Sequence, residues 1–267
     1  MSVHSLRIVK KLAEKLSVFL LLVAVVGMIV WWRRDDNTQA VLKNTNIPTD
    51  TQKTAQSTKP ISSPGFNKKQ YSVNDPASIW VVVNKGRILP ADYVPANLVE
   101  NMNLRSEPAT ALKSLINGAA KDGLKLILVS GYRSYTSQKS VYDSYVATQG
   151  QAAADTFSAR PGHSEHQTGL AADVGASSGK CQLDKCFGDT PEGQWLAANA
   201  YSYGFIIRYP QDKTSLTGYD FEPWHIRYIG IDLANEVNKT GQTLEQFFGL
   251  PAYSNYPADY YQLKTGS

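Results

Sequence analysis

The chain has 267 residues, enough for one large domain or two small ones, and its 42% hydrophobic and 19% charged residues are ordinary for a globular protein. The net charge of +4 comes from residues 1–34, where six basic residues and one acidic residue give +5, so that the rest of the chain carries −1. A body this close to neutrality excludes the basic surface on which nucleic-acid binding depends, and we expect no nucleic-acid partner.

The first predicted element is an apolar segment, residues 16–32, which runs for seventeen residues without a charge. As a helix it is at the short end of what spans a bilayer core of roughly 30 Å. Four basic residues precede it and two follow, the latter beside two aspartates, so the positive-inside bias places residues 1–15 in the cytoplasm. We predict a single-pass anchor at 16–34 and an extracytoplasmic body at the cell membrane.

The same segment has two alternative interpretations, a cleaved signal peptide and a buried helix of a soluble domain. A signal peptide normally ends in small residues at its cleavage site, whereas this segment ends in two tryptophans and two arginines. A helix on the core of a soluble domain would show a polar face, and residues 16–32 have none. An uncleaved anchor fits the sequence better than either alternative.

Residues 35–70 are rich in Thr, Asn, Gln, Ser, Lys and Pro, and their few apolar residues follow no period. Such a segment cannot bury a core, so we predict a flexible linker that holds a domain at 71–267 away from the membrane.

The pattern becomes that of a globular domain from about Tyr71. Apolar runs and β-branched residues predict strands at 79–87, 124–130, 169–175, 205–210 and 224–230. Helical spacing and capping residues predict helices at 107–121, 137–150, 191–203, 231–239 and 243–248, the third of them capped by Thr190. Because helices and strands do not alternate regularly, we expect an α+β fold rather than a doubly wound parallel sheet.

The two cysteines, Cys181 and Cys186, are separated by four residues. In an exported domain they would form a disulfide that closes a short loop. Their spacing does not fit a CxxC redox motif, and no second pair completes a four-cysteine zinc site. The alternative is two unrelated thiols, which are less expected in an oxidising compartment.

Three of the four histidines lie in two dense segments, residues 160–174 and 221–228. Catalytic zinc usually takes three protein ligands and leaves one position open. His166 and Asp173 lie in the first segment, where Gly169 permits a bend between them, and His225 lies in the second. Glu222, three residues before His225, would stay unligated and accept a proton from water.

Other polar residues of these segments have simpler interpretations. His163 stands outside the metal-binding pattern and is expected to be a loop or supporting residue. Glu165 would point away from His166 on an extended segment, which predicts a solvent-exposed side chain. Asp173 could be an ordinary acid at a strand end, but its apolar neighbours predict a buried carboxylate that needs a partner such as a metal.

The motif S-x-H-x(2)-G-x-A-x-D at 164–173, followed by E-x-x-H at 222–225, resembles the two signatures of the VanY-type D-alanyl-D-alanine carboxypeptidases and their L,D-carboxypeptidase relatives. These are zinc peptidases that trim cell-wall stem peptides. The segment SGYRSYTSQ at 130–138 is similar to a third block of that family. The resemblance covers roughly residues 71–250, and the HExxH motif of the common helical zinc proteases is absent.

The resemblance implies a Hedgehog/D-Ala-D-Ala peptidase-like zinc domain with a small antiparallel sheet flanked by helices, behind the N-terminal transmembrane helix. It implies Zn²⁺ as the cofactor, with His166, Asp173 and His225 as ligands and Glu222 as the catalytic base. Arg133 would stabilise charge on the scissile carbonyl oxygen, although it could instead be a structural ion-pair partner. The remaining positions, implied as substrate contacts or as packing beside the site, are Ser164, Gln138, Tyr209 and Trp224.

The function that follows is removal of the C-terminal D-alanine from a peptidoglycan stem peptide by a monomeric enzyme. Cleavage between two D-residues is favoured, and L,D-cleavage of tetrapeptide stems is the alternative. An endopeptidase that cuts cross-links is a close variant. Two rivals from other classes are a non-catalytic cell-wall-binding module, which would have lost a ligand or the base, and a signalling ectodomain with a structural zinc ion, which would need a fourth ligand.

Overall fold

A computed structural model describes residues 66–266 of the chain. The predicted cytoplasmic segment at 1–15, the anchor at 16–34 and most of the linker at 35–70 lie outside the described residues. Among residues 66–266, no helix combines the length and the apolar character that crossing a bilayer requires. The packed unit includes Phe66, whose ring stacks on Trp80 at a centroid distance of 5.5 Å.

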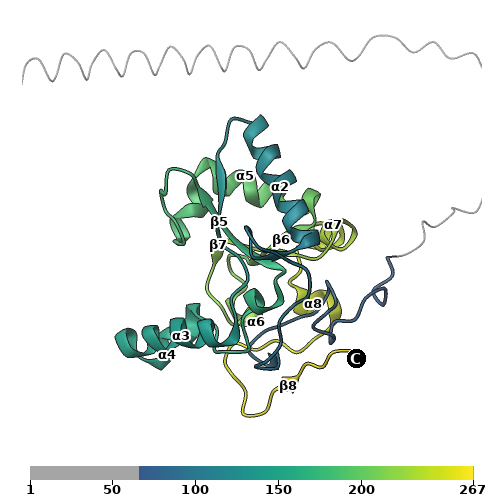
Figure 1. Cartoon of the computed structure of the whole chain (residues 1–267), viewed down its shortest axis with the longest axis vertical. Coiled ribbons are helices and arrows are strands. Elements are labelled where there is room, and N and C mark those ends of the chain that lie inside the picture. The colour runs from purple at the N-terminus through teal and green to yellow at the C-terminus, as the bar shows by residue number, and fades with distance from the viewer. Residues whose placement is uncertain (1–65, 267) are drawn as a thin grey trace, which may run out of the picture. The chain divides into compact units, whose positions relative to one another are not determined.

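Four strands form the central sheet, and all their pairings are antiparallel, which confirms the predicted small antiparallel sheet. Their order across the sheet is β4-β5-β7-β6, and Figure 1 labels the last three of these strands. The strands are β4 (Leu126–Ser130), β5 (Ala171–Ala176), β6 (Phe205–Tyr209) and β7 (Glu222–Tyr228). The register places Asp173 opposite His225, and Tyr209 opposite Glu222. Motifs that lie about fifty residues apart in the chain therefore meet on adjacent strands.

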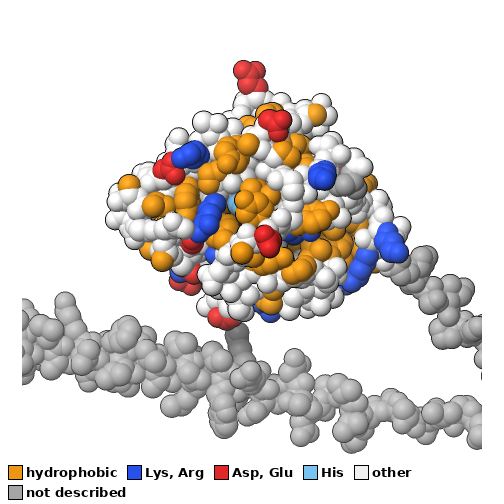
Figure 2. All heavy atoms as spheres, turned by 90° about the horizontal axis from the view of Figure 1, so that it is seen from below, with side chains coloured by type: hydrophobic (Ala, Val, Ile, Leu, Met, Phe, Trp, Pro, Cys, Tyr) orange, Lys and Arg blue, Asp and Glu red, His pale blue; other side chains and the backbone are white. Residues whose placement is uncertain are grey.

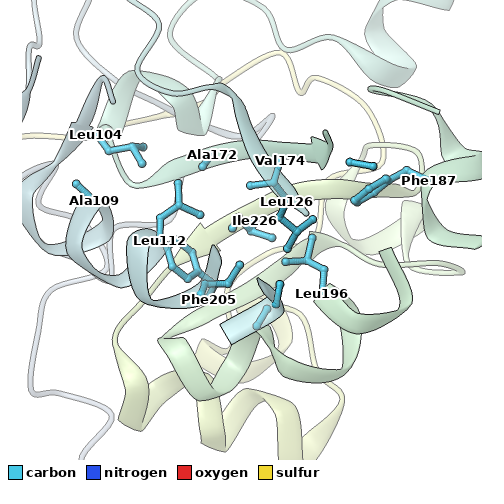
Figure 3. Packing of buried hydrophobic residues seen from close by; sticks show 14 residues of the cluster. Leu104, Ala109, Leu112, Leu126, Ala172, Val174, Phe187, Leu196, Phe205 and Ile226 are labelled. Carbon is cyan, nitrogen blue, oxygen red and sulfur yellow. The ribbon is translucent and has the colours of Figure 1, made fainter. Parts of the chain in front are cut away.

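Two helices cover one side of this sheet, α2 (Ser106–Lys121) and α5 (Pro191–Asn199) (Figure 1). Thr190 caps α5 as predicted, because its side chain accepts a hydrogen bond from the amide of Gly193. A short 3-10 turn, Ala200–Tyr203, continues the chain beyond α5. Figure 3 shows the core between these helices and the sheet, which is formed by residues that include Leu112, Leu126, Val174, Leu196, Phe205 and Ile226.

The other helices are α3 (Tyr135–Gln149), α4 (Gln151–Phe157), α6 (Thr214–Thr217), α7 (Ile231–Thr240) and α8 (Leu244–Phe248). Figure 1 shows α3 and α4 on the side of the sheet away from α2. Figure 2 shows the molecule from the side on which α3, α4 and β8 (Tyr261–Gln262) lie, and hydrophobic side chains gather across the middle of this face. A second core cluster joins α7 and α8 to Trp80 and Val82.

The strand predicted at 79–87 is largely wrong. Only β1 (Arg87–Ile88) is a strand there, and it pairs in parallel with β8. Side chains from 80–83 do alternate between two core clusters, as they would in a strand. However, the guanidinium groups of Arg227 and Arg87 donate to the carbonyls of Ile79, Val81 and Val82, so arginine side chains take the place that a neighbouring strand would have. A separate hairpin, β2 (Leu98–Val99) with β3 (Leu104–Arg105), precedes α2.

Candidate active site

The three side chains predicted to bind a metal lie together at the centre of the sheet. Oδ2 of Asp173 is 3.2 Å from Nε2 of His166, and Oδ1 of Asp173 is 3.1 Å from Nδ1 of His225. One nitrogen or oxygen atom from each of the three residues lies within 4.8 Å of the others, and all three residues are buried. The pairing of β5 with β7 sets this arrangement, because it fixes Asp173 opposite His225.

A short 3-10 turn, η1 (Glu165–Thr168), brings His166 to the site. Ser164 caps this turn, and its hydroxyl accepts a hydrogen bond from the amide of His166. Gly169 ends the turn in the left-handed region at φ 67°, where a residue with a Cβ would be strained, and the chain then enters β5. Nδ1–H of His166 donates to the carbonyl of Gly131 over 2.7 Å, so in the neutral ring the free electron pair is on Nε2, the nitrogen that faces Asp173.

The donor set fits a zinc ion. Two imidazole nitrogens and one carboxylate are ligands typical of catalytic zinc. The hydrogen bonding among residues 66–266 also leaves Oδ1 of Asp173 without a partner although it is buried. A buried carboxylate oxygen without a hydrogen bond is costly, and a cation between the three side chains would satisfy it.

Glu222 lies beside this cluster without sharing its tight contacts. Its Oε2 is 3.7 Å from Nδ1 of His225, and its side chain lines the same cavity. Burial raises the pKa of Glu222 to about 8, an effect that the nearby Asp173 carboxylate reinforces. A carboxyl group with a pKa near neutrality can accept and return a proton at physiological pH.

Asp173 and His225 differ from Glu222, because neighbouring charges shift their pKa values against the effect of burial. Burial alone would raise the pKa of Asp173, but His166 and His225 beside it hold the pKa of this carboxyl far below its usual range. Burial alone would lower the pKa of His225, but its contacts with Asp173 and Glu165 raise that pKa to about 9. The charges of His166, Asp173 and His225 therefore depend on one another.

Glu165 corrects the prediction of a solvent-exposed side chain, because it is fully buried. Its Oε1 accepts hydrogen bonds from Nε of Arg208 at 2.8 Å and Nη1 of Arg227 at 2.7 Å. The prediction failed because residues 165–168 form a 3-10 turn, in which side chains do not alternate between two faces as they do in a strand. The missed signal was an arginine within each of the apolar strands 205–209 and 222–228.

Arg133 follows β4 and reaches the edge of the cluster. Its Nη2 is 4.0 Å from Oδ2 of Asp173, and its Nη1 donates to Oε1 of Gln138 at 3.0 Å. Gln138 is buried and also donates from Nε2 to the carbonyl of Ala159. Both polar atoms of Gln138 are thus engaged within the protein, and the residue orients Arg133.

The predicted site residues line one cavity of about 440 Å³. Tyr209 stands against the ring of His225 at a centroid distance of 4.9 Å, and Ser164 and Trp224 form other parts of the wall. His163 is not part of the lining, because it is buried with its Nδ1 bound to the carbonyl of Asn84. The other lining residues that the sequence did not single out are Val141, Tyr145, Phe157, Ser158, Ala159, Leu183, Asp184, Lys185, Tyr219 and Asp220.

The predicted disulfide between Cys181 and Cys186 is confirmed. Its loop borders the cavity, to which Leu183, Asp184 and Lys185 contribute. Leu183 has a φ of 54°, a left-handed conformation that is uncommon for a bulky residue. The residue is also 44% exposed. Lys185 bridges to Asp220 across this margin at 2.8 Å.

Comparison with protein families matches residues 101–231 to the family described as "VanY: D-alanyl-D-alanine carboxypeptidase". The chain is 42% identical over 189 residues to the "Putative carboxypeptidase YodJ" of Bacillus subtilis, an alignment that covers 66% of this chain and 69% of the relative. It is 36% identical over 180 residues to a "D-alanyl-D-alanine carboxypeptidase" of Enterococcus faecalis, covering 62% of this chain and 64% of that one.

Solved structures with both specificities are similar to this chain. The LD-carboxypeptidase LdcB shares 42% identity at a TM-score of 0.62, over 65% of this chain and 87% of that one. The vancomycin-resistance D,D-pentapeptidase VanY, solved as a variant with Zn(II), shares 36% identity at a TM-score of 0.55, over 62% of this chain and 97% of that one.

Proposed function

Because the chain belongs to the VanY family of D-alanyl-D-alanine carboxypeptidases, we propose that it is a zinc-dependent enzyme that removes the C-terminal D-alanine from peptidoglycan stem peptides. The observation that carries this proposal is the meeting of His166, Asp173 and His225 beside Glu222 in one cavity. All four side chains are present, which argues against a binding module that has lost its chemistry.

The residues divide the chemistry between them. A zinc ion held by His166, Asp173 and His225 would polarise the scissile carbonyl and make water more acidic. Glu222 takes the proton from the attacking water and returns it to the leaving amine, for which a pKa of about 8 is suitable. Arg133 directs a permanent positive charge toward the cavity and stabilises the negative charge that develops on the carbonyl oxygen.

Recognition of the substrate's free carboxylate falls to groups at the cavity wall. Arg133 keeps its guanidinium within reach of this space, and Gln138 holds it in place. Ser164 also lines the cavity, while Tyr209 and Trp224 supply aromatic surface for the D-alanine methyl group and the preceding residue.

L,D-cleavage of tetrapeptide stems is a second candidate. The solved LD-carboxypeptidase shares more sequence identity and a higher TM-score with this chain than the D,D-pentapeptidase does. The two reactions differ in the residue on the amino side of the scissile bond, and the part of the wall formed by α3 and α4, with Val141, Tyr145 and Phe157, is a candidate for distinguishing them.

We also propose that residues 16–34 anchor the enzyme, as a monomer, in the cell membrane with its catalytic domain outside. Disulfides persist mainly in oxidising compartments, so the Cys181–Cys186 bond supports an extracytoplasmic domain. The stem peptide of the cell wall is available in that location.

The test is incubation of the full-length protein with pentapeptide and tetrapeptide stems, followed by mass spectrometry of the products. Loss of one D-alanine from one of them, abolished by a zinc chelator and by Glu222→Ala, supports the proposal and identifies the bond. Glu236→Ala, which changes a glutamate on α7 outside the cavity, is the matched control and should keep full activity. No release from either peptide would overturn the carboxypeptidase proposal.

A further inference from the structure

A buried cluster of four charged side chains lies directly behind the candidate metal site. It consists of Glu165 on η1, Arg208 on β6, Arg227 on β7 and Glu245 on α8, with side chains 0–1% exposed. Arg208 binds both carboxylates, through Nε to Glu165 at 2.8 Å and through Nη2 to Glu245 at 2.6 Å. Two positive and two negative charges balance, so the cluster is neutral as a whole. Charges this deeply buried are rare unless they are paired, and each member here is paired.

One carboxylate oxygen of Glu165, Oε2, makes no hydrogen bond within this cluster. Oε1 of Glu165 accepts from both arginines, but Oε2 has no hydrogen-bond partner among the described residues. This oxygen faces Nε2 of His225 at 3.6 Å, and that nitrogen is also buried without a hydrogen-bond partner. The two unpaired atoms therefore face each other, and each would be costly to leave unsatisfied.

The Glu165 carboxylate has little freedom to turn away from this contact. Arg227, which binds it, is itself held by the carbonyls of Ile79 and Val81, and Arg208 is held by Glu245. An ionised carboxylate can only accept hydrogen bonds, so the nitrogen that faces Oε2 can satisfy it only by carrying a proton. The proton of the neutral His225 ring then lies on Nε2, and its Nδ1, which faces Asp173, has a free electron pair.

We propose that Glu165 is a positioning residue that holds the proton of His225 on Nε2, so that Nδ1 is available to the metal. This inference rests on the proposed zinc site. His166 shows the complementary arrangement, because its Nδ1–H is held by the Gly131 carbonyl and its Nε2 faces the cluster. The two histidines thus use opposite ring nitrogens, and each is fixed by an acceptor behind it. Partners of this kind typically alter metal affinity 10- to 100-fold when removed.

Glu165→Gln tests the inference. The amide oxygen can still accept from the two arginines, which turns the amide NH₂ group toward Nε2 of His225. That nitrogen must then accept a hydrogen bond, which moves the ring proton to Nδ1 and blocks it as a ligand. We expect zinc affinity, measured by chelator competition on the full-length protein without substrate, to fall about 10- to 100-fold.

Glu245→Gln is the matched control. It removes the same charge from the same arginine, Arg208, but Glu245 is paired with Arg208 and Asn84 and has no contact with His225. Its zinc affinity should remain within about twofold of wild type. Equal loss in both variants, or no loss in Glu165→Gln, would overturn the inference, because either result would make Glu165 a structural residue only.

A second measurement needs no variant and applies even if Glu165→Gln fails to fold. The chain has only four histidines, so selective ¹⁵N labelling of their rings resolves each tautomer in the zinc-loaded protein. We expect a protonated Nε2 on His225 and a protonated Nδ1 on His166. A proton on Nδ1 of His225 would overturn the inference while leaving the carboxypeptidase proposal intact. A wild-type protein that binds no zinc would instead contradict the proposed function.

Discussion

Asp173 and His225 face each other across the paired strands β5 and β7, with Oδ1 of the carboxylate 3.1 Å from Nδ1 of the ring. Both residues are buried, and the contacts of His225 with this carboxylate and with Glu165 raise its pKa to about 9 against the opposing effect of burial. A proton on this nitrogen and a cation between the two side chains compete for the same space. Metal binding must therefore be coupled to proton release.

The first prediction concerns this coupling. At pH 7 the metal-free ring of His225 is protonated, because its pKa is about 9, and zinc binds only the neutral ring. Zinc binding at pH 7 should therefore release about one proton from this ring, and zinc affinity should rise as pH is raised from 6 toward 9. Calorimetry in buffers of different ionisation enthalpy measures the proton count. A binding enthalpy independent of the buffer would contradict the prediction.

The second prediction separates chemistry from metal binding. Glu222→Gln removes the proton acceptor but keeps the size of the side chain, and Glu222 is not one of the three grouped ligands. We expect kcat to fall by about 10²- to 10⁴-fold, the usual contribution of general acid–base catalysis. Zinc affinity should stay close to wild type. Steady-state kinetics and chelator competition on the same preparation check both statements, and a variant that loses zinc would show that Glu222 acts as a ligand.

The third prediction concerns the disulfide loop. Replacing Cys181 and Cys186 together by serine should destabilise the protein by about 2 kcal/mol, the loop-entropy value for six residues, and lower Tm by about 4–8 °C. The freed loop no longer holds Leu183 at the cavity, so KM should rise more than kcat falls. Leu183→Ala, which keeps the disulfide, is the control and should raise KM without the loss of Tm. An unchanged Tm in the double variant would refute the stabilising role.

The fourth prediction concerns acid stability. Burial alone would raise the pKa of Glu245, but its ion pair with Arg208 lowers it, so the carboxylate stabilises the fold above its unfolded pKa of about 4.3. This contribution is lost as pH falls through the lower pKa of the folded state. Glu245→Gln should therefore cost about 3–5 kcal/mol at pH 7, as removal of one partner from a buried pair does.

The same variant has a distinctive pH profile. Its stability should depend less steeply on pH below about 4 than that of wild type, so that the two unfolding curves approach each other in acid. Denaturant unfolding at several pH values measures this difference. If the difference in the free energy of unfolding between wild type and Glu245→Gln stayed constant down to pH 2, Glu245 would stabilise the protein through packing alone.

Much of the site could be predicted from the sequence because its ligands lie in short motifs. His166 and Asp173 are seven residues apart, and the turn at Gly169 joins them, so local pattern suffices to group them. Glu222 lies three residues before His225, so the local pattern groups this pair as well. The family resemblance then supplies the pairing of the two motifs, which composition cannot give.

Glu165 and the segment 79–83 could not be predicted in the same way. The burial of Glu165 depends on Arg208 and Arg227, which reach it only when β6 and β7 are paired. The carbonyls of Ile79 and Val81 are bound by Arg227, about 150 residues away, and no local propensity reports that competition. In both cases the guanidinium group of an arginine far away in the sequence determines the local structure, and the neighbouring residues do not.

The register between β5 and β7 limits how this enzyme can diversify. A slip of one residue in either strand would turn His225 or Asp173 to the opposite face of the sheet, so single insertions in these strands abolish the site. We expect changes of length to be tolerated instead in the α3–α4 segment and in the disulfide loop, which border the cavity without contributing one of the three grouped ligands. New peptide preferences should therefore arise by remodelling these two margins around an unchanged pair of strands.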